Sequence, residues 1–172
     1  MGTGAALPLS PQEMQTVRAE INNEFSSLQD AFQVTSWPLD TYNCIAWAAE
    51  DHCYWWWPDP DYESFWPRGV DREDTVVAFI AAFQTMGYEL CDSYDLEPGF
   101  EKVAIYSAGE RVKHMARQLP SGAWTSKLGD WWDIAHNSVD GVQDPPTRIH
   151  YGVKRKAMRR IMPHLAVIPS AT

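Results

Sequence analysis

Residues 102–128 read KVAIYSAGERVKHMARQLPSGAWTSKL, and this stretch decides the fold class. It holds three segments rich in β-branched, aromatic and alternating residues, which is typical of strands. The segments are Lys102–Ser107, Val112–Leu119 and Trp124–Leu128. Ala108-Gly109 and Ser121-Gly122 separate them and are typical of tight turns. The stretch therefore predicts consecutive antiparallel strands, with Tyr88–Cys91 as a further candidate.

Helices are predicted ahead of these strands. Ser10 can cap a helix that has Pro11 in its first turn and Glu13 three residues after the cap. An apolar stripe at steps of three and four then continues to about residue 30. The stripe consists of Met14, Val17, Ile21, Phe25 and Leu28. A second helix is predicted from Cys44 towards residue 51.

A third predicted helix covers residues 71–86, with Asp71 as its cap and Gly87 after its end. Helices followed by strands favour the α+β class, with N-terminal helices packed on a small antiparallel sheet. The 172 residues fit one domain. We expect a flexible lead over residues 1–9, a single domain over 10–147, and a basic C-terminal helix and tail over 148–172. Residues 35–40 are predicted as a linker, and residues 130–140 as short helical or irregular structure.

The formal net charge of −9 is unevenly distributed. From Arg148 to the end there are six basic residues and no acidic one, so the rest carries 8 basic and 23 acidic residues. An acidic body repels phosphates, which argues against nucleic acid as the main partner. The basic end is predicted to pack against that body.

Cysteine usage and apolar runs bear on localisation. Three cysteines without a secretory segment favour reduced thiols and a cytoplasmic protein. No run is long and apolar enough to predict a membrane span.

Cys44 is the strongest candidate for chemistry, because it stands at a predicted helix start. Free N–H groups and partial positive charge at such a place lower a thiol pKa and can bind an oxyanion. Asn43 is a candidate additional donor. The alternative is a buried structural cysteine, since free cysteines are among the most buried residues.

His114 opens the predicted strand 112–119 and shares a face with Ala116 and Gln118, which is not an ordinary core face. A histidine within reach of a thiol can act as its general base, commonly with a third group that orients the ring. A tight turn is expected to pair Gln118 with Thr125. That register places Ser126 on the face opposite His114.

The orienting group is left open among Asp130, Asp133 and His136. His52, Cys53 and Cys91 do not show the paired spacing of metal ligands, so neither a metal site nor a cofactor is predicted.

Residues 54–70 form an aromatic, proline-broken loop directly after the Cys44 helix. In one interpretation the Trp55–Trp57 run and Trp66 form the wall of a substrate groove, with Trp56 and Trp57 as the candidate binding residues. In the other the loop packs onto the core, which is the commoner use of aromatic side chains.

Several motifs together resemble an uncharacterised bacterial domain family over about residues 36–137. They are NCIAWA from Asn43, WWP from Trp56, FWP from Phe65, FEKVAIY from Phe100, His114 with ARQL, and WTSKLG from Trp124. More distantly, the layout is similar to papain-like cysteine hydrolases of the NlpC/P60 and CHAP kinds. That resemblance implies Cys44 as nucleophile and His114 as base.

These observations predict a cysteine-dependent hydrolase, a peptidase or amidase that acts on a peptide or amide substrate. One alternative is a binding module with a Trp-rich groove, in which Cys44 is merely packed. Another is a transglutaminase-like acyl transferase that uses the same dyad.

Overall fold

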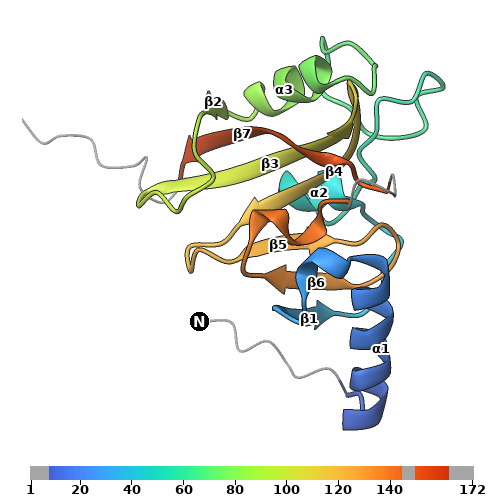
Figure 1. Ribbon diagram of the computed structural model, residues 1–172. Helices are drawn as coiled ribbons and strands as arrows, with labels where there is room; N and C mark the ends of the chain where they lie inside the picture. The colour runs from blue at the N-terminus through green and yellow to red at the C-terminus, as the bar shows by residue number, and fades with distance from the viewer. Residues whose placement is uncertain (1–7, 145–149, 163–172) are drawn as a thin grey trace, which may run out of the picture.

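Seven strands form one antiparallel sheet in the computed structural model, which describes residues 8–144 and 150–162 (Figure 1). The strands are β1 Phe32–Ser36, β2 Glu89–Cys91, β3 Phe100–Ala108, β4 Arg111–Gln118, β5 Trp124–Lys127, β6 Asp133–His136 and β7 Val153–Ile161. Their order across the sheet is β1-β6-β5-β4-β3-β7-β2. Strands β3 to β5 follow one another directly, as the turn pattern predicts, and β6 continues the series, whereas β7 inserts between β3 and β2.

The predicted α+β, papain-like arrangement is wrong, because the fold is dominated by this sheet and its helices are few and short. The α-helices of the described residues are α1 Pro11–Glu24, α2 Cys44–Ala48 and α3 Val76–Gln84. Strand β1 begins before the predicted linker, and β6 lies where irregular structure was expected. Strand β7 occupies the predicted C-terminal helix. Strands β1 and β7 have only partners distant in sequence, and β6 pairs with β1 as well as with the neighbouring β5, so the local pattern of each is weak.

Strand β7 is buried on both faces at its centre, where Ala157 and Met158 are at most 2% exposed. Its arginines pair with carboxylates elsewhere in the fold. Arg159 contacts Glu89 and Glu97, and Arg160 contacts Glu50 and Glu101. The expectation that the basic segment packs on the acidic body is therefore confirmed for residues 150–162, but by a strand. Residues 148–149 and 163–172 of the predicted helix and tail lie outside the described residues.

Gly152 brings β7 against β3. It has a φ of +76°, and a Cβ there would lie 2.1 Å from the carbonyl oxygen of Ser107. Only glycine fits this approach.

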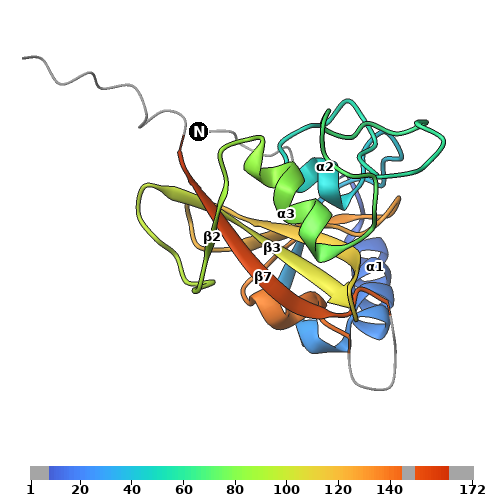
Figure 2. The same cartoon turned by 90° about the horizontal axis from the view of Figure 1, so that it is seen from above.

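The sheet carries a hydrophobic core on each face. Val103, Ile105 and Met115 pack with α2, α3 and the aromatic loop. Ala104 and Tyr106 pack instead with α1 and two 3₁₀ turns, η1 Ser26–Leu28 and η2 Val139–Val142. Figures 1 and 2 show α3 near the β7–β2 end of the sheet and α1 near the β1–β6 end. Alternate residues of a strand point to opposite faces of the sheet, and this decides which side chains can contact α2.

The predicted start of α1 is confirmed. Ser10 and Glu13 form the reciprocal capping box, and Pro11 is the first helical residue. The helix ends at Glu24, and the apolar stripe continues through Phe25 into η1. Helix α3 starts later than predicted, because Thr75 rather than Asp71 caps it.

Candidate functional site

Asn43 links α2 to the aromatic loop. Its Oδ1 accepts the Ala46 N–H at 3.0 Å, and its Nδ2 donates to the Trp56 carbonyl at 2.7 Å. The first bond caps α2, and the second holds the following loop. Both ends of this amide therefore help to position Cys44. The Nδ2 group, predicted as a donor to the oxyanion, is already bonded to the Trp56 carbonyl.

Cys44 is 7% exposed and lies in the core on the α2 face. Burial raises the pKa of its thiol to about 11, while the N–H groups of Met115, Cys44 and Ile45 act in the opposite direction. Burial outweighs these donors because it removes water from the thiolate. The thiol is accordingly protonated at neutral pH.

His114 is fully buried on the opposite side of β4. Met115 packs in the core with α2, so the preceding side chain points to the other face. There the His114 ring stacks on Tyr151 with centroids 4.1 Å apart, and its centroid lies 5.4 Å from that of Tyr106.

The pairing of β4 with β5 differs by one residue from the predicted register. Arg117 pairs with Thr125, and Gln118 pairs with Trp124. A shift of one residue moves every side chain to the other face. Ser126, expected opposite His114, therefore lies on the same face and contacts it.

A chain of hydrogen bonds runs from His114 across β5 to β6. His114 Nε2 lies 3.0 Å from Ser126 Oγ, which lies 3.0 Å from His136 Nε2. His136 Nδ1 lies 2.7 Å from the Ser138 carbonyl oxygen. We call this chain the imidazole relay.

The last link assigns every proton in the imidazole relay. A carbonyl can only accept, so neutral His136 carries its proton on Nδ1 and accepts at Nε2. Ser126 must then donate to His136 and accept from His114 Nε2–H. Neutral His114 is consequently unprotonated at Nδ1.

His114 Nδ1 has no hydrogen-bond partner among the described residues, although it is buried. Burial, followed by the charges of His136 and His150, lowers the pKa of His114 well below its usual range. Burial also lowers the pKa of His136 to about 4. Both rings are therefore neutral at pH 7. A buried ring nitrogen without a partner is unusual in a folded protein.

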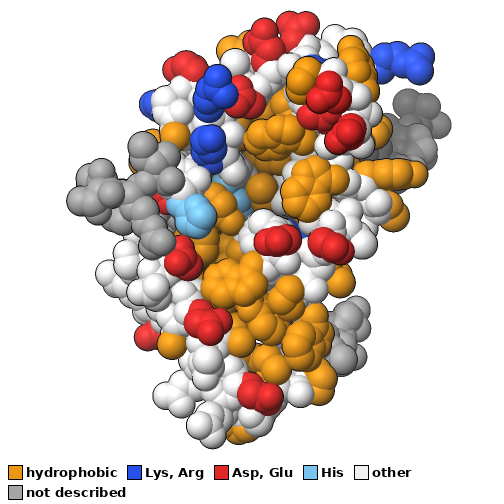
Figure 3. Space-filling view, turned by 90° about the vertical axis from the view of Figure 1, so that its right-hand side faces the viewer, with side chains coloured by type: hydrophobic (Ala, Val, Ile, Leu, Met, Phe, Trp, Pro, Cys, Tyr) orange, Lys and Arg blue, Asp and Glu red, His pale blue; other side chains and the backbone are white. Residues whose placement is uncertain are grey.

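A cavity of about 330 Å³ opens beside Cys44. It is lined by Asn43, Cys44, Trp55, Trp57, Lys113, Gly129 and Tyr151. Figure 3 shows one face of the molecule on which apolar side chains gather around a hollow. Tyr151 both lines this cavity and covers the His114 ring, so it connects the two predicted site residues.

The structure does not join Cys44 to His114 by any hydrogen bond of the described residues. Strand alternation turns their side chains to different faces of β4, and the sulfur instead lies beside the Met115 N–H. Within the described residues, β4 pairs with β5 only at Arg117 and Gln118, so the part of β4 that carries His114 and Met115 has no backbone pairing with β5.

Of the predicted aromatic residues, some line the cavity and others lie in the core. Trp57 lines the cavity, whereas Trp56 is 5% exposed, lies in the core and donates from Nε1 to Asp51 at 2.8 Å. Trp55, which belongs to the predicted aromatic wall, also lines the cavity and is 39% exposed, whereas Trp66 is 6% exposed and lies in the core. Tyr151 was not predicted.

The three candidates for the orienting group also have different roles. Asp133 accepts the Tyr42 hydroxyl at 2.7 Å and lies 3.6 Å from the buried Lys127 ammonium. His136 reaches His114 through Ser126, which the predicted register had excluded. Asp130 has no contact with His114 among the described hydrogen bonds.

Residues 8–144 and 150–162 contain no group of three or more His, Cys, Asp or Glu side chains arranged to hold a metal ion. Cys53 is exposed and Cys91 is half-buried, and both are free thiols. Within the same residues, no helix has the length and apolar character needed to cross a bilayer.

Residues 33–159 match the family described as Domain of unknown function (DUF7689). The predicted resemblance to an uncharacterised domain family is thereby confirmed over a somewhat longer range. No curated protein and no solved structure matches the chain, so the resemblance to papain-like hydrolases gains no support.

Proposed function

This chain belongs to that family of unknown function, and we propose that it is a thiol-dependent acyl-transfer enzyme that hydrolyses an amide or peptide bond. Cys44 is the proposed nucleophile and His114 Nδ1 the proposed base. The observation that carries the proposal is the imidazole relay, because it holds the ring at Nε2 and leaves Nδ1 unprotonated and unpartnered. A general base needs a free lone pair and a group that orients its ring.

The proposed reaction has two halves. Cys44 sulfur forms a bond to the substrate carbonyl carbon while its proton passes to His114 Nδ1. The C–N bond then breaks, and the amine leaves with that proton. Water attacks the resulting thioester and gives a proton to Nδ1, the thiol leaves and regains that proton, and a carboxylic acid is released. The N–H groups of Cys44 and Ile45 beside the sulfur are candidate donors to the oxyanion.

The resting pair in this proposal is neutral. The thiol pKa is raised and the imidazole pKa is lowered, so the proton moves during attack rather than before it. Cys44 packs with Met115 on one face of β4, whereas His114 contacts Tyr106 on the other face. The sulfur and Nδ1 must therefore approach each other past the part of β4 that is not paired with β5. The Tyr151 ring stacks on His114 and also lines the cavity beside Cys44, so we expect this ring to move when substrate binds.

The cavity lining favours an apolar or aromatic group next to the scissile bond. Trp55, Trp57 and Tyr151 supply aromatic walls, which bury ring and alkyl groups well. Lys113 is the one charged side chain among the lining residues. It favours a carboxylate or other acidic group at the entrance.

The test uses activated p-nitrophenyl esters of acetic, butyric and phenylacetic acid. We expect an acyl adduct on Cys44 in the intact mass, located by peptide mapping and absent in Cys44→Ala. His114→Gln should slow acylation at least about 100-fold. Cys53→Ala, which removes an exposed thiol, serves as the matched control. An adduct on Cys53 alone, or an unchanged rate in His114→Gln, would contradict the proposal.

Adding a primary amine to the acylated protein separates hydrolysis from the transglutaminase-like alternative. Hydrolysis releases the free acid, whereas acyl transfer releases the amide of the added amine.

Non-enzymatic binding in the same cavity is a second candidate function. It is favoured by one observation, the raised pKa of the buried Cys44 thiol. The measurement is the binding of phenylacetate or a phenylalanyl peptide. Saturable binding without acylation, equally strong in Cys44→Ala, would support this candidate. Loss of that binding in Trp57→Ala would place it in the cavity.

A further inference from the structure

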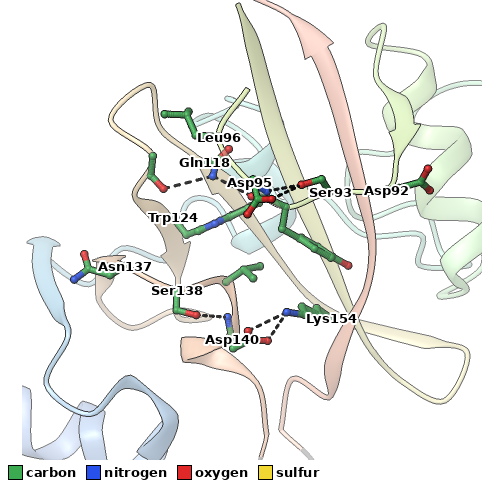
Figure 4. A pocket seen from close by; sticks show the side chains of 13 residues that line it. Asp92, Ser93, Asp95, Leu96, Gln118, Trp124, Asn137, Ser138, Asp140 and Lys154 are labelled. Atoms are coloured by element: carbon green, nitrogen blue, oxygen red, sulfur yellow. Dashed lines mark hydrogen bonds and ion pairs between the residues drawn. The ribbon is translucent and has the colours of Figure 1, made fainter. Parts of the chain in front are cut away.

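A second pocket, of about 570 Å³, lies away from Cys44 and is lined mainly by polar side chains (Figure 4). Its walls come from the loop of residues 92–96, the β4–β5 turn and residues 137–140, with Lys154 on β7. We call it the loop pocket. No proposed catalytic residue lines it, and its one link to the imidazole relay is Ser138.

Gln118 supplies an unused acceptor to the loop pocket. Its side chain is 6% exposed, and Nε2 donates to the carbonyls of Tyr94 at 3.2 Å and Gly122 at 3.4 Å. Because both partners can only accept, the amide orientation is determined. Oε1 has no partner among the described hydrogen bonds.

Trp124 supplies an unused donor. It is 3% exposed and lines the loop pocket, where its ring centroid lies 6.3 Å from that of Tyr94. Its Nε1–H makes no hydrogen bond to the described residues. Figure 4 shows Trp124 next to Gln118 among the lining side chains. A donor and an acceptor without a partner among the described residues thus belong to one site.

The charges of the loop pocket exclude an anionic ligand. Asp92, Asp95 and Asp140 line it, and the only cation lining it, Lys154, is paired with Asp140 at 2.7 Å. An apolar ligand would leave Gln118 Oε1 and Trp124 Nε1 without partners. An ammonium group would satisfy the acceptors but has no acceptor for the Trp124 N–H.

A hydroxyl both donates and accepts, so it is the group that matches all of these atoms. A ring that carries several hydroxyls and packs its apolar face on the half-buried Tyr94 matches the mixture of carboxylate, amide and aromatic groups. We propose that the loop pocket is a saccharide-binding site. Its volume falls in the usual range for small-ligand sites.

The test is a titration of the ¹⁵N-labelled full chain with glucose, galactose, mannose, N-acetylglucosamine and cellobiose, followed by the indole N–H cross-peaks of the nine tryptophans. Trp124→Phe identifies the Trp124 cross-peak. We expect a saturable shift of that cross-peak with at least one saccharide, at a Kd of about 1 mM for a single ring.

Gln118→Leu should weaken this binding at least about tenfold, because it removes the acceptor. Gln33→Leu, at an exposed position on β1, is the matched control and should bind as the wild type does. Asp95→Asn provides a second variant if Gln118→Leu does not fold. Cys44→Ala should also bind normally, which separates this site from the acyl-transfer proposal.

Three results would overturn the assignment. One is no shift of the Trp124 cross-peak with any of the saccharides at about 50 mM. Another is a shift with putrescine and none with the saccharides, which would indicate a cation site. The third is unchanged saccharide binding in both Gln118→Leu and Asp95→Asn.

Discussion

Burial sets the protonation of the residues at the proposed site. Cys44 and His114 each lose water, and the loss favours the neutral form of both. The imidazole relay then determines which nitrogen of His114 is basic. Reactivity at this site consequently depends on proton transfer during attack.

The raised pKa of Cys44 predicts slow alkylation in the free protein. With Cys44 as the single cysteine, its reaction with iodoacetamide at pH 7.5 should be at least about 100-fold slower than that of Cys53 in the matched single-cysteine variant. The Cys44 rate should still increase above pH 9. A plateau below pH 8 would show that the thiol ionises early, against this prediction.

The lowered pKa of His136 predicts loss of stability in acid. The unfolded ring binds a proton near pH 6.5 and the folded ring only near pH 4, so the unfolded state binds more protons between these values. Stability is therefore complete above about pH 7 and falls as the pH drops from 6.5 towards 4. At pH 5 the loss from His136 should be about 2 kcal/mol.

Urea unfolding between pH 7.5 and 5 measures this dependence. His136→Asn should make the pH dependence shallower, although the variant is less stable overall. His52→Asn, at an exposed position, is the control and should leave the dependence unchanged. Equal slopes for the wild type and His136→Asn would contradict the assignment.

At the scale of elements, short segments are held in place by side-chain hydrogen bonds. Helix α2 has five residues, too few to be stable alone, and the Asn43 amide attaches it to the aromatic loop. Arg72 similarly donates to the Asp59 carbonyl at 2.8 Å and the Ser64 carbonyl at 3.2 Å, which holds that loop against the start of α3. The cavity beside Cys44 depends on these links.

Asn43→Ala should lower the free energy of unfolding by about 1–3 kcal/mol, since it removes a helix cap and leaves the Trp56 carbonyl unpaired. Asn43→Ser keeps a neutral cap acceptor and loses the bond to the Trp56 carbonyl, so its loss should be smaller. Chemical denaturation of the three proteins provides the comparison. Equal losses in the two variants would show that the cap contributes nothing.

At the scale of the whole molecule, one sheet separates two cores and supports both candidate sites. The segment 137–138 belongs to both sites, because the Ser138 carbonyl ends the imidazole relay while Asn137 and Ser138 line the loop pocket. Strand β7 completes the sheet by joining β3 to β2.

Met158→Asp on β7 should abolish cooperative unfolding, because it buries an unpaired carboxylate in the core on the α2–α3 face of the sheet. Lys156→Asp, two residues earlier at an exposed position, should change stability by less than about 1 kcal/mol. Thermal unfolding followed by circular dichroism distinguishes the two. A cooperative transition in Met158→Asp near that of the wild type would show that β7 is dispensable.

The sequence by itself determined the features that depend on neighbouring residues. The capping box at Ser10, the helix start at Cys44 and the strand–turn pattern of residues 102–128 all result from contacts within a few positions, so their signals are local. The family resemblance rests on the same segments.

Only the tertiary structure decided which strands pair and which faces meet. Strands β1 and β7 acquire their partners from distant residues, β6 pairs with β1 as well as with its neighbour β5, and the patterns of all three are short or interrupted by charges. A one-residue difference in the β4–β5 register brought Ser126 to His114, and burial reversed the expected activation of Cys44. Register and burial are properties of the assembled sheet, because each depends on atoms that are remote in the chain.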